Sequence, residues 1–214
     1  DGMWLDRFTV RNLEIIHPSH PDGTSLAETL DRTSTPMGAR MLRRWLIMPL
    51  TDKEAIEARH LAVSLLTDQE KLSTNMKTIL SGVGDLERLA SKASSAKINP
   101  RELVQLRRGL EGVLKVAEEA AGEVALLPIL ERLSPCDSLR FRLDKELEDE
   151  APNQVGKGAV IKPGVNQELD QVRSLAFESH KALEIIREKE VEKTGISSLK
   201  IGFNNVFGYY LEVR

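Results

Sequence analysis

The feature that most constrains the fold is a long, charged segment from about Asn166 to Lys193 that has the period of one continuous helix. Its apolar residues fall on one side of that helix, and they are Leu169, Val172, Ala176, Leu183 and Ile186. At 1.5 Å per residue the helix would span roughly 40 Å. An apolar stripe this narrow is typical of a helix that pairs with one partner helix, and we expect that partner to lie outside this chain.

Directly after this segment the hydrophobic period changes from helical to alternating. Gly195 ends the helix, and apolar residues then alternate with polar ones from Leu199 to Phe203. Turn residues follow from Asn204 to Gly208, and a second alternating run extends from Tyr209 to Arg214. This pattern predicts a β-hairpin. Because an isolated hairpin is only marginally stable, we expect the natural protein to continue and this chain to be a fragment.

The residues before the long helix carry start signals for several shorter helices. Thr35 and Asn99 are good N-cap residues, and each is followed by a proline at the first helical position. Thr51 and Glu54 have the spacing of a capping box. Apolar stripes at helical spacing predict helices over about 36–48, 51–67, 72–81, 86–93, 100–117, 126–133 and 137–148.

Two stretches interrupt this helical pattern. The first thirty residues read as irregular, with an extended segment within Phe8–Ile16 and a loop over His17–Gly23. Residues 149–165 read as a loop with a short strand at Val160–Ile161. The predicted fold is mainly α. It has a multi-helical domain over residues 1–165, a long protruding helix over 166–194, and part of an antiparallel β region over 195–214.

Composition limits the class of protein further. Aromatic residues make up only 4% of the 214 residues, which favours helices over a β-sandwich or barrel. The net charge of −3 leaves no overall basic footprint, so any nucleic-acid contact must be local. The single cysteine, Cys136, excludes an internal disulfide, and a buried thiol would fit a reducing cytoplasm. No apolar run approaches the ~18 residues of a membrane span, and no signal peptide is evident.

No catalytic or cofactor motif is evident. Gly156-Lys157-Gly158 is too short for a phosphate-binding loop and lacks the hydroxyl residue that would hold Mg²⁺. His17 and His20 could share a metal ion, but histidines on a loop are usually only solvated, and Cys136 has no evident histidine partner. The sequence therefore predicts no enzyme activity, no metal and no cofactor for this segment.

Two basic features could contact an anion. The arginines of residues 40–44 could bind phosphate, although a solvated or salt-bridged helix face is the more common meaning of such a cluster. The hairpin offers cationic, amide and phenol donors in Lys200, Asn204, Asn205, Tyr209, Tyr210 and Arg214. Such groups position a phosphate backbone without reading base sequence. An ordinary hairpin turn with packed tyrosines is the alternative.

Five stretches of the sequence, in order along the chain, resemble the core of the MutS family. They are residues 11–15, residues 30–46 (LDRTSTPMGARMLRRWL) with Pro49-Leu50, residues 83–89 (VGDLERL), residues 162–170 (KPGVNQELD) and residues 194–213 (TGISSLKIGFNNVFGYYLEV). The first resembles the family's strand leading into its core. The fourth resembles the entry into its long lever helix, and the fifth the start of its DNA clamp. The residues of these motifs resemble those of bacterial members of the family more than those of eukaryotic members.

The resemblance implies a role in DNA mismatch repair. In this family a homodimer encircles duplex DNA, and levers connect an ATPase to clamps that hold the DNA backbone. By resemblance, residues 1–165 would be the core or lever domain, residues 166–194 the lever helix and residues 195–214 the incomplete clamp. ATP and Mg²⁺ would bind only in a separate ATPase domain, and a MutL-type partner is expected for the whole protein.

Two alternative functions stay open on the sequence. One is the lever and clamp of a MutS relative that acts on recombination intermediates. The other is an unrelated helical scaffold that binds a protein partner through its amphipathic helices. For the mismatch-repair reading, the candidate DNA-backbone contacts are the six hairpin residues named above.

Overall fold

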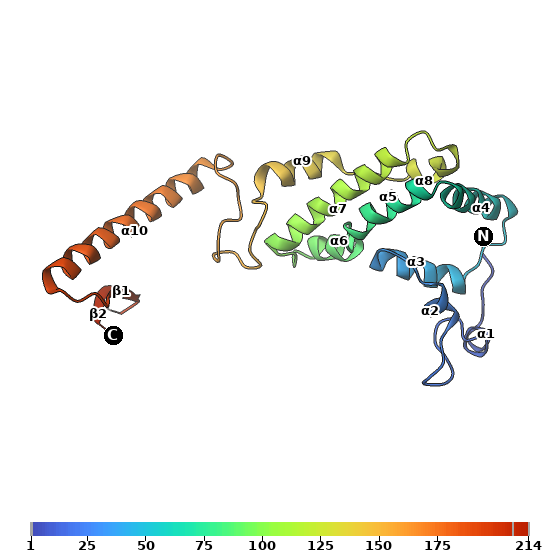
Figure 1. Ribbon diagram of the computed structural model, residues 1–214, viewed down its shortest axis with the longest axis horizontal. Coiled ribbons are helices and arrows are strands. Elements are labelled where there is room, and N and C mark those ends of the chain that lie inside the picture. The colour runs from blue at the N-terminus through green and yellow to red at the C-terminus, as the bar shows by residue number, and fades with distance from the viewer. Residues whose placement is uncertain (1, 207, 214) are drawn as a thin grey trace. The chain divides into compact units, whose positions relative to one another are not determined.

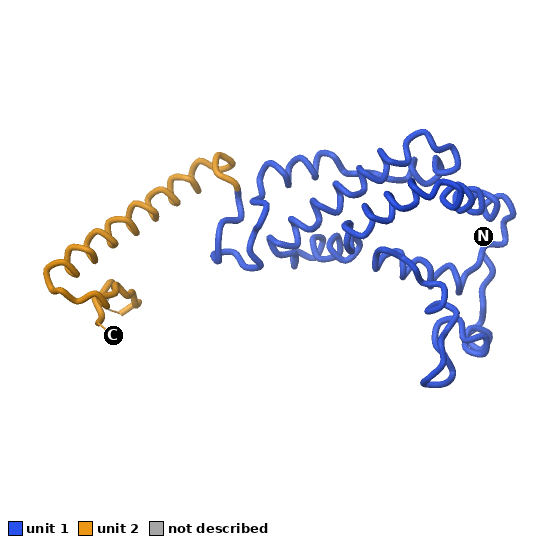
Figure 2. Tube along the Cα trace, in the orientation of Figure 1, with its two compact units in different colours: residues 1–161 blue, residues 162–214 orange. Residues whose placement is uncertain are grey.

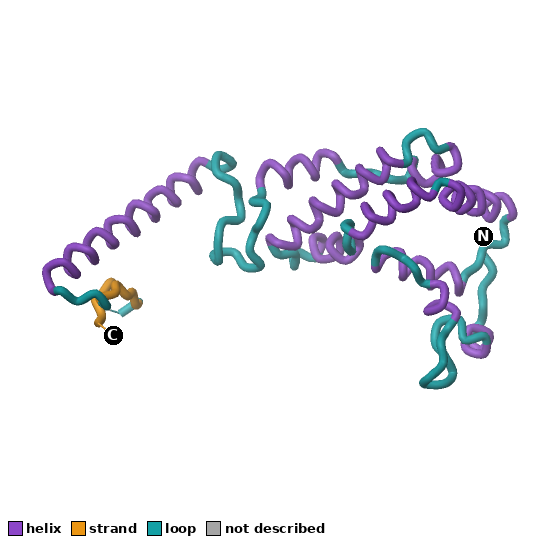
Figure 3. The backbone as a smooth tube through the Cα atoms, in the orientation of Figure 1, coloured by secondary structure: helices purple, strands orange, loops and turns teal. Residues whose placement is uncertain are grey.

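In the described part of the chain most residues are helical, and a pair of strands follows the last helix (Figures 1 and 3). The structure is a computed structural model that describes residues 2–206 and 208–213. The helices are α1 (Arg7–Asn12), α2 (Leu26–Leu30), α3 (Pro36–Ile47), α4 (Lys53–Asp68), α5 (Glu70–Ser81), α6 (Leu86–Ser94), α7 (Pro100–Glu119), the 3-10 turn η1 (Val124–Leu126), α8 (Leu127–Leu130), α9 (Asp137–Glu146) and α10 (Gln167–Thr194). The strands are β1 (Leu199–Asn204) and β2 (Gly208–Val213). The predicted fold class, mainly helical with a long helix before a small antiparallel sheet, is confirmed.

The chain divides into two units, residues 1–161 and residues 162–214 (Figure 2). The first unit contains α1 to α9, and the second contains α10 and the hairpin. In the described residues no helix has the length and apolar character needed to cross a membrane.

Within the first unit, α7 is the central helix, and α5, α6 and α9 pack against it (Figure 1). The start of α7 follows the predicted signals. The Asn99 side chain accepts a hydrogen bond from the Glu102 backbone N–H at 2.9 Å, and the Glu102 carboxylate accepts from the Asn99 N–H at 3.1 Å. This capping box satisfies two backbone donors at the helix end, and Pro100 needs none.

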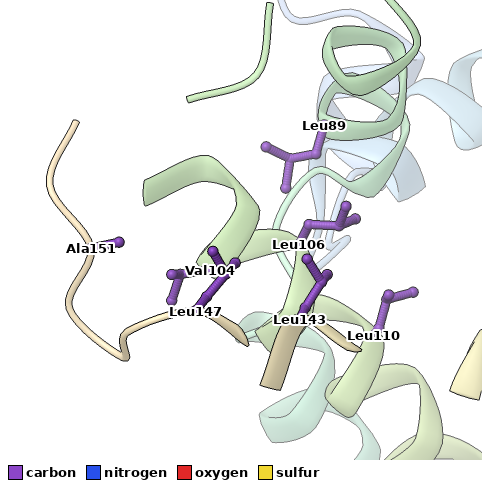
Figure 4. Close-up of a cluster of buried hydrophobic side chains, with 7 residues drawn as sticks. All are labelled: Leu89, Val104, Leu106, Leu110, Leu143, Leu147 and Ala151. Carbon is purple, nitrogen blue, oxygen red and sulfur yellow. The ribbon is translucent and has the colours of Figure 1, made fainter. Parts of the chain in front are cut away.

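The main apolar core lies where α7 meets α6 and α9 (Figure 4). Its buried members are Leu89, Val104, Leu106, Leu110, Leu143, Leu147 and Ala151. A smaller cluster of Ala62, Ala120 and Leu126 joins α4 to the end of α7 and to η1. Burial of apolar side chains such as these, worth about 1.5–3 kcal/mol for each large one, is what holds short helices together in water.

Two glycines let the segment before α6 approach α7 closely. A Cβ atom on Gly109 would lie 2.7 Å from the Val83 carbonyl oxygen and 2.5 Å from Leu86 Cδ2. A Cβ atom on Gly112 would lie 2.6 Å from Val83 Cγ2. Helical glycine is unfavourable by about 1 kcal/mol relative to alanine. Here the cost is offset by the packing of Val83, which is 3% exposed.

A buried arginine joins α7 to α9 and to the segment after it. The Arg107 side chain is only 7% exposed, and its guanidinium lies 3.1 Å from Asp144 and 2.8 Å from Asp149. The third acidic neighbour, Glu111, lies 3.8 Å from Nε, which has no hydrogen-bond partner among the described residues. The guanidinium charge of Arg107 is therefore buried, and it is neutralised by carboxylates that are themselves exposed to solvent.

The expectation of an irregular N-terminal segment with an extended run in Phe8–Ile16 is wrong. Residues 7–12 form α1 because the Asp6 carboxylate accepts hydrogen bonds from the backbone N–H groups of Phe8 and Thr9 at 2.8 and 3.0 Å. A second helix, α2, begins with a capping box between Ser25 and Glu28. Residues 11–15, which resemble a strand of the family, form the end of α1 and the turn that follows it.

Three smaller expectations are also corrected. The N-cap of α4 is Asp52 rather than Thr51, because the Asp52 carboxylate accepts from the Ala55 N–H at 2.8 Å. Val160–Ile161 forms no strand, only a single bridge between Ile161 and Leu147. The Cys136 thiol is exposed rather than buried, and this residue adopts a left-handed conformation (φ 49°) at the start of α9.

The long helix of the second unit matches its prediction closely, running from Gln167 to Thr194. The Asn166 side chain caps its start by accepting from the Leu169 N–H at 2.9 Å. None of its residues is buried. Five of its large apolar side chains are exposed by 45–71%, and they are Val172, Leu175, Phe177, Ile185 and Ile186, whereas Leu169, Leu183 and Val191 are partly buried.

Candidate nucleic-acid interface

The hairpin begins where Gly195 ends α10. Gly195 adopts φ 72° and ψ 8°, a left-handed conformation that glycine reaches without a Cβ clash. Its backbone N–H donates to the Val191 carbonyl at 2.8 Å, which closes the last turn of the helix. Leu199, at the start of β1, is 6% exposed and anchors the hairpin.

The register of the two strands divides the hairpin into two faces. The antiparallel pairs are Leu199 with Val213, Lys200 with Glu212, Ile201 with Leu211, Gly202 with Tyr210, Phe203 with Tyr209 and Asn204 with Gly208. Residues directly opposite each other share a face, and successive residues alternate between faces. One face therefore carries Lys200, Asn204 and Tyr210, and the other is apolar.

Tyr210 packs across the hairpin onto Gly202. A Cβ atom built on Gly202 would lie 2.6 Å from Tyr210 Cζ and 2.8 Å from its hydroxyl oxygen. The ring thus covers the backbone of β1 at the one position that has no side chain, and it remains 39% exposed. Tyr210 stabilises the strand pairing as well as lining the polar face.

Tyr209 lies on the opposite, apolar face. Its ring centroid is 4.9 Å from that of Phe203, with the two planes at 55°. Such a tilted aromatic pair across two strands is favourable beyond its buried area. The two tyrosines that the sequence places in one candidate set are therefore separated by the sheet.

The turn between the strands is held by Asn204. Its side-chain oxygen accepts a hydrogen bond from the Val206 N–H at 3.0 Å, an Asx turn. Asn205 is exposed in this turn, and Gly208 re-enters the sheet at φ 72°. Of the six predicted contacts, Lys200, Asn204 and Tyr210 thus share one face and Asn205 lies at the tip. Tyr209 lies on the other face, and Arg214 lies outside the described residues.

A groove of about 740 Å³ separates the hairpin from α10. It is lined by Ala176, Ser179, His180, Leu183, Glu184 and Arg187 of α10 and by Lys200, Ile201, Gly202, Phe203 and Tyr209 of the hairpin. The sequence does not identify these α10 residues as site candidates, because a charged face of a helix is usually only exposed to solvent. Their spacing in the sequence places them on one face of the helix. Only the folded structure shows that this face lies beside the hairpin.

The other basic feature, residues 40–44, is partly salt-bridged. Arg40 donates two hydrogen bonds to the Asp85 carboxylate, at 2.8 and 2.9 Å, and two to Glu87, one of them from Nε at 3.1 Å. Hydrogen bonding to Arg40 lowers the pKa of Asp85 to about 2. Asp85 also caps α6 by accepting from the Arg88 N–H at 3.2 Å. Arg40 is therefore a structural group that connects α3 to α6.

Acid should weaken this connection. The pKa of Asp85 is depressed in the folded chain, so its stabilising effect is complete above the unfolded value of 3.8 and is lost as the pH falls towards 2. Asp85→Asn keeps an N-cap acceptor but removes the charge. Wild type should be more stable than this variant at pH 7, and the difference should shrink between about pH 4 and pH 2. Urea denaturation at several pH values measures it, and a difference that stays constant with pH would refute the pairing.

Among residues 2–206 and 208–213, no group of three or more histidine, cysteine, aspartate or glutamate side chains is arranged to hold a metal ion.

The protein-family model for MutS domain III matches residues 8–200 of the chain. The chain belongs to the MutS family. Two of the stretches that resemble the family, residues 30–46 and 83–89, meet in the contact between Arg40 and Asp85.

The MutS relatives agree with this assignment. DNA mismatch repair protein MutS of Cytophaga hutchinsonii is 44% identical over 213 residues, which is 99% of this chain and 25% of that protein. The proteins of the same name from Flavobacterium johnsoniae and Parabacteroides distasonis are 42% and 44% identical, over 99% and 98% of this chain and 25% and 24% of their own lengths. The chain thus spans about a quarter of the MutS relatives it matches. It corresponds to their domain III, which is not a catalytic domain.

Proposed function

We propose that this chain is the lever and the first part of the DNA clamp of a mismatch-repair protein, and that its hairpin holds the sugar-phosphate backbone of duplex DNA. The observation that carries the proposal is the position of Lys200. It is exposed on the polar face of a hairpin at the end of a 28-residue helix. Among the described residues its ammonium has no carboxylate within the 4.0 Å of an ion pair. A free cation there suits a phosphate.

The neighbours of Lys200 favour contact with backbone rather than with bases. Asn204, Asn205 and Tyr210 add amide and phenol groups, and Tyr209 and Arg214 complete the proposed set. Side chains of these types are among the common donors to phosphate oxygens, which with the sugars receive half or more of protein–DNA hydrogen bonds. Glu212, opposite Lys200, would repel a deeply inserted strand and so favours contact along the edge of the duplex.

The remaining parts of the proposal concern the whole protein. Relatives named as DNA mismatch repair proteins support that process for this one. By family resemblance we propose a homodimer around DNA, a MutL-type partner, a cytoplasmic location, and ATP with Mg²⁺ in a separate ATPase domain. The long helix α10 would couple DNA binding to ATP hydrolysis, because a helix is stiff enough to transmit a displacement.

Lys200→Ala should weaken DNA binding by the full-length polypeptide that contains these residues. We expect matched and mismatched duplexes to lose affinity alike, by about three- to tenfold at moderate salt, because one phosphate contact is removed. The slope of log affinity against log salt should become shallower by about 0.9. Fluorescence anisotropy with labelled duplexes over a salt series measures both.

Lys200→Arg is the matched control, since it keeps the charge and should retain most of the affinity. A loss confined to mismatched DNA would contradict a backbone contact. Unchanged binding to both duplexes would contradict a role of this hairpin face in holding DNA.

A further inference from the structure

One cross-strand pair on the polar face of the hairpin lies in closer contact than strand pairing alone requires. Gly202 and Tyr210 are directly opposite each other in the register. A Cβ atom on Gly202 would lie 2.6 Å from Tyr210 Cζ, 2.8 Å from the hydroxyl oxygen and 2.9 Å from Cε2. All three atoms belong to the outer end of the tyrosine side chain. The ring therefore lies across β1, and its hydroxyl lies over the strand that carries Lys200.

The absence of a side chain at position 202 makes this placement of the ring possible. A Cβ atom does not tolerate neighbours closer than 3.0 Å, so any other residue at this position would displace the ring. An aromatic ring that covers a glycine of the neighbouring strand is a recurrent way to stabilise a sheet. Because the displaced atoms are the free end of a side chain, the strands themselves could stay paired. Gly202 thus determines where the Tyr210 hydroxyl lies.

This placement brings the hydroxyl close to Lys200. Lys200 and Gly202 share one face of β1 and are about 7 Å apart along the strand, a distance that an extended lysine side chain can cover. Within residues 2–206 and 208–213, the Tyr210 hydroxyl forms no hydrogen bond and the Lys200 ammonium has no carboxylate oxygen within 4.0 Å. Tyr210 is also 39% exposed. One charged donor and one neutral donor are therefore available beside each other.

The other polar side chains of this face limit where an anion can bind. The side-chain oxygen of Asn204 accepts a hydrogen bond from the Val206 N–H at 3.0 Å, so Asn204 belongs to the turn. Glu212 is directly opposite Lys200, and its negative charge repels an anion on that side. An anion bound to Lys200 is therefore directed towards the Tyr210 ring.

We propose that Lys200 and the Tyr210 hydroxyl bind the same phosphodiester of duplex DNA, and that Gly202 is the positioning residue for this shared contact. The lysine supplies charge, and the hydroxyl donates a directional hydrogen bond to a phosphate oxygen. The inference rests on the proposed function. It adds to that function the pairing of two donors on one phosphate and a role for a residue that has no side chain.

Tyr210→Phe in the full-length polypeptide removes the hydroxyl and keeps the ring over Gly202. It should weaken binding to matched and mismatched duplexes about three- to tenfold, the effect of one lost hydrogen bond. The slope of log affinity against log salt should not change, because a hydroxyl releases no counterion. Ser198→Ala is the matched control, since it removes an exposed hydroxyl directly before β1. It should change affinity less than about twofold, because this hydroxyl is not part of the phosphate contact.

Gly202→Ala tests the positioning role. The new methyl group should displace the end of the Tyr210 ring and weaken binding by about the same three- to tenfold, again without a change in salt slope. In the Tyr210→Phe background the same substitution should cost less than about twofold, because the hydroxyl that it displaces is already absent. Anisotropy over one salt series compares all variants, and circular dichroism checks that they are folded. A shallower salt slope for Gly202→Ala would overturn its role, since Lys200 would then have lost its contact as well.

The double variant Lys200→Ala/Tyr210→Phe tests whether the two donors share a phosphate. If they do, the combined loss of affinity should be smaller than the product of the two single losses. Independent effects would overturn the shared contact. A loss with Lys200→Ala but none with Tyr210→Phe would overturn the inference and leave the proposed function intact. If neither variant weakened binding, both the inference and the proposed function would fail.

Discussion

Replacing both Asp144 and Asp149 with alanine is expected to destabilise the chain by about 3 kcal/mol, which is more than removal of Arg107 itself. The two aspartates are the close ion-pair partners of a guanidinium whose side chain is 7% exposed. Without them the charge stays buried beside Glu111 alone, at 3.8 Å. A buried charge that loses its partners is among the most costly changes in a protein.

Arg107→Met should cost less, about 1–2 kcal/mol. The carboxylates left behind are 61% and 68% exposed, so water can solvate them, and the methionine side chain fills part of the vacated volume. Urea denaturation followed by circular dichroism gives the free energies of unfolding.

The triple variant completes the comparison. Once Arg107 is methionine, the two alanine substitutions should cost less than they do beside Arg107, so the effects should be non-additive. The explanation is wrong if Arg107→Met is at least as destabilising as the double aspartate variant, or if the three substitutions are additive.

Gly109→Ala is expected to destabilise the chain by about 1–2 kcal/mol, although alanine is the better helix former. Helix propensity favours the substitution by about 1 kcal/mol. The new Cβ atom would lie 2.7 Å from the Val83 carbonyl oxygen, a backbone atom that cannot move without displacing the segment before α6. Overpacking of this kind costs typically 1–3 kcal/mol, and rearrangement of the Leu86 side chain adds to it.

Gly82→Ala is the matched control, because it lies at the end of α5 and a Cβ there has its nearest neighbour at 3.5 Å. Its φ of −90° suits alanine, so we expect a change within roughly 0.5 kcal/mol in either direction. Gly112→Ala should fall between the two, since its closest neighbour is the end of the Val83 side chain. If Gly109→Ala were as mild as Gly82→Ala, the close approach of α7 and the segment before α6 would not constrain this fold.

The helices that the sequence predicts well are those with complete local signals. Thr35 before Pro36 and Asn99 before Pro100 start α3 and α7 where expected, and Gly195 ends α10. The two helices that the sequence does not predict, α1 and α2, escape prediction for the same reason. Asp6 and Ser25 are equally good caps, but the helices they start have six and five residues, too short for an apolar stripe to stand out.

The candidate site was predicted only in part for a related reason. Alternation identified both strands and placed Lys200 and Tyr210 on them. The sequence-based prediction groups all six donors as one surface. The pairing of Phe203 with Tyr209 instead assigns Tyr209 to the face of the hairpin opposite Lys200 and Tyr210. The α10 side of the groove had no sequence signal distinct from that of an ordinary charged helix face.

By itself, the sequence determined the helical class, the ends of the long helices, the hairpin and the resemblance to the MutS family. These depend on caps, periodicity and motifs, which act over a few neighbouring residues. Only the tertiary structure decided that Arg40 joins Asp85, that Arg107 is buried against Asp144 and Asp149, and that α10 and the hairpin line one groove. Each of these contacts joins residues far apart in the chain or on different elements, and it forms only where packing and strand register bring them together.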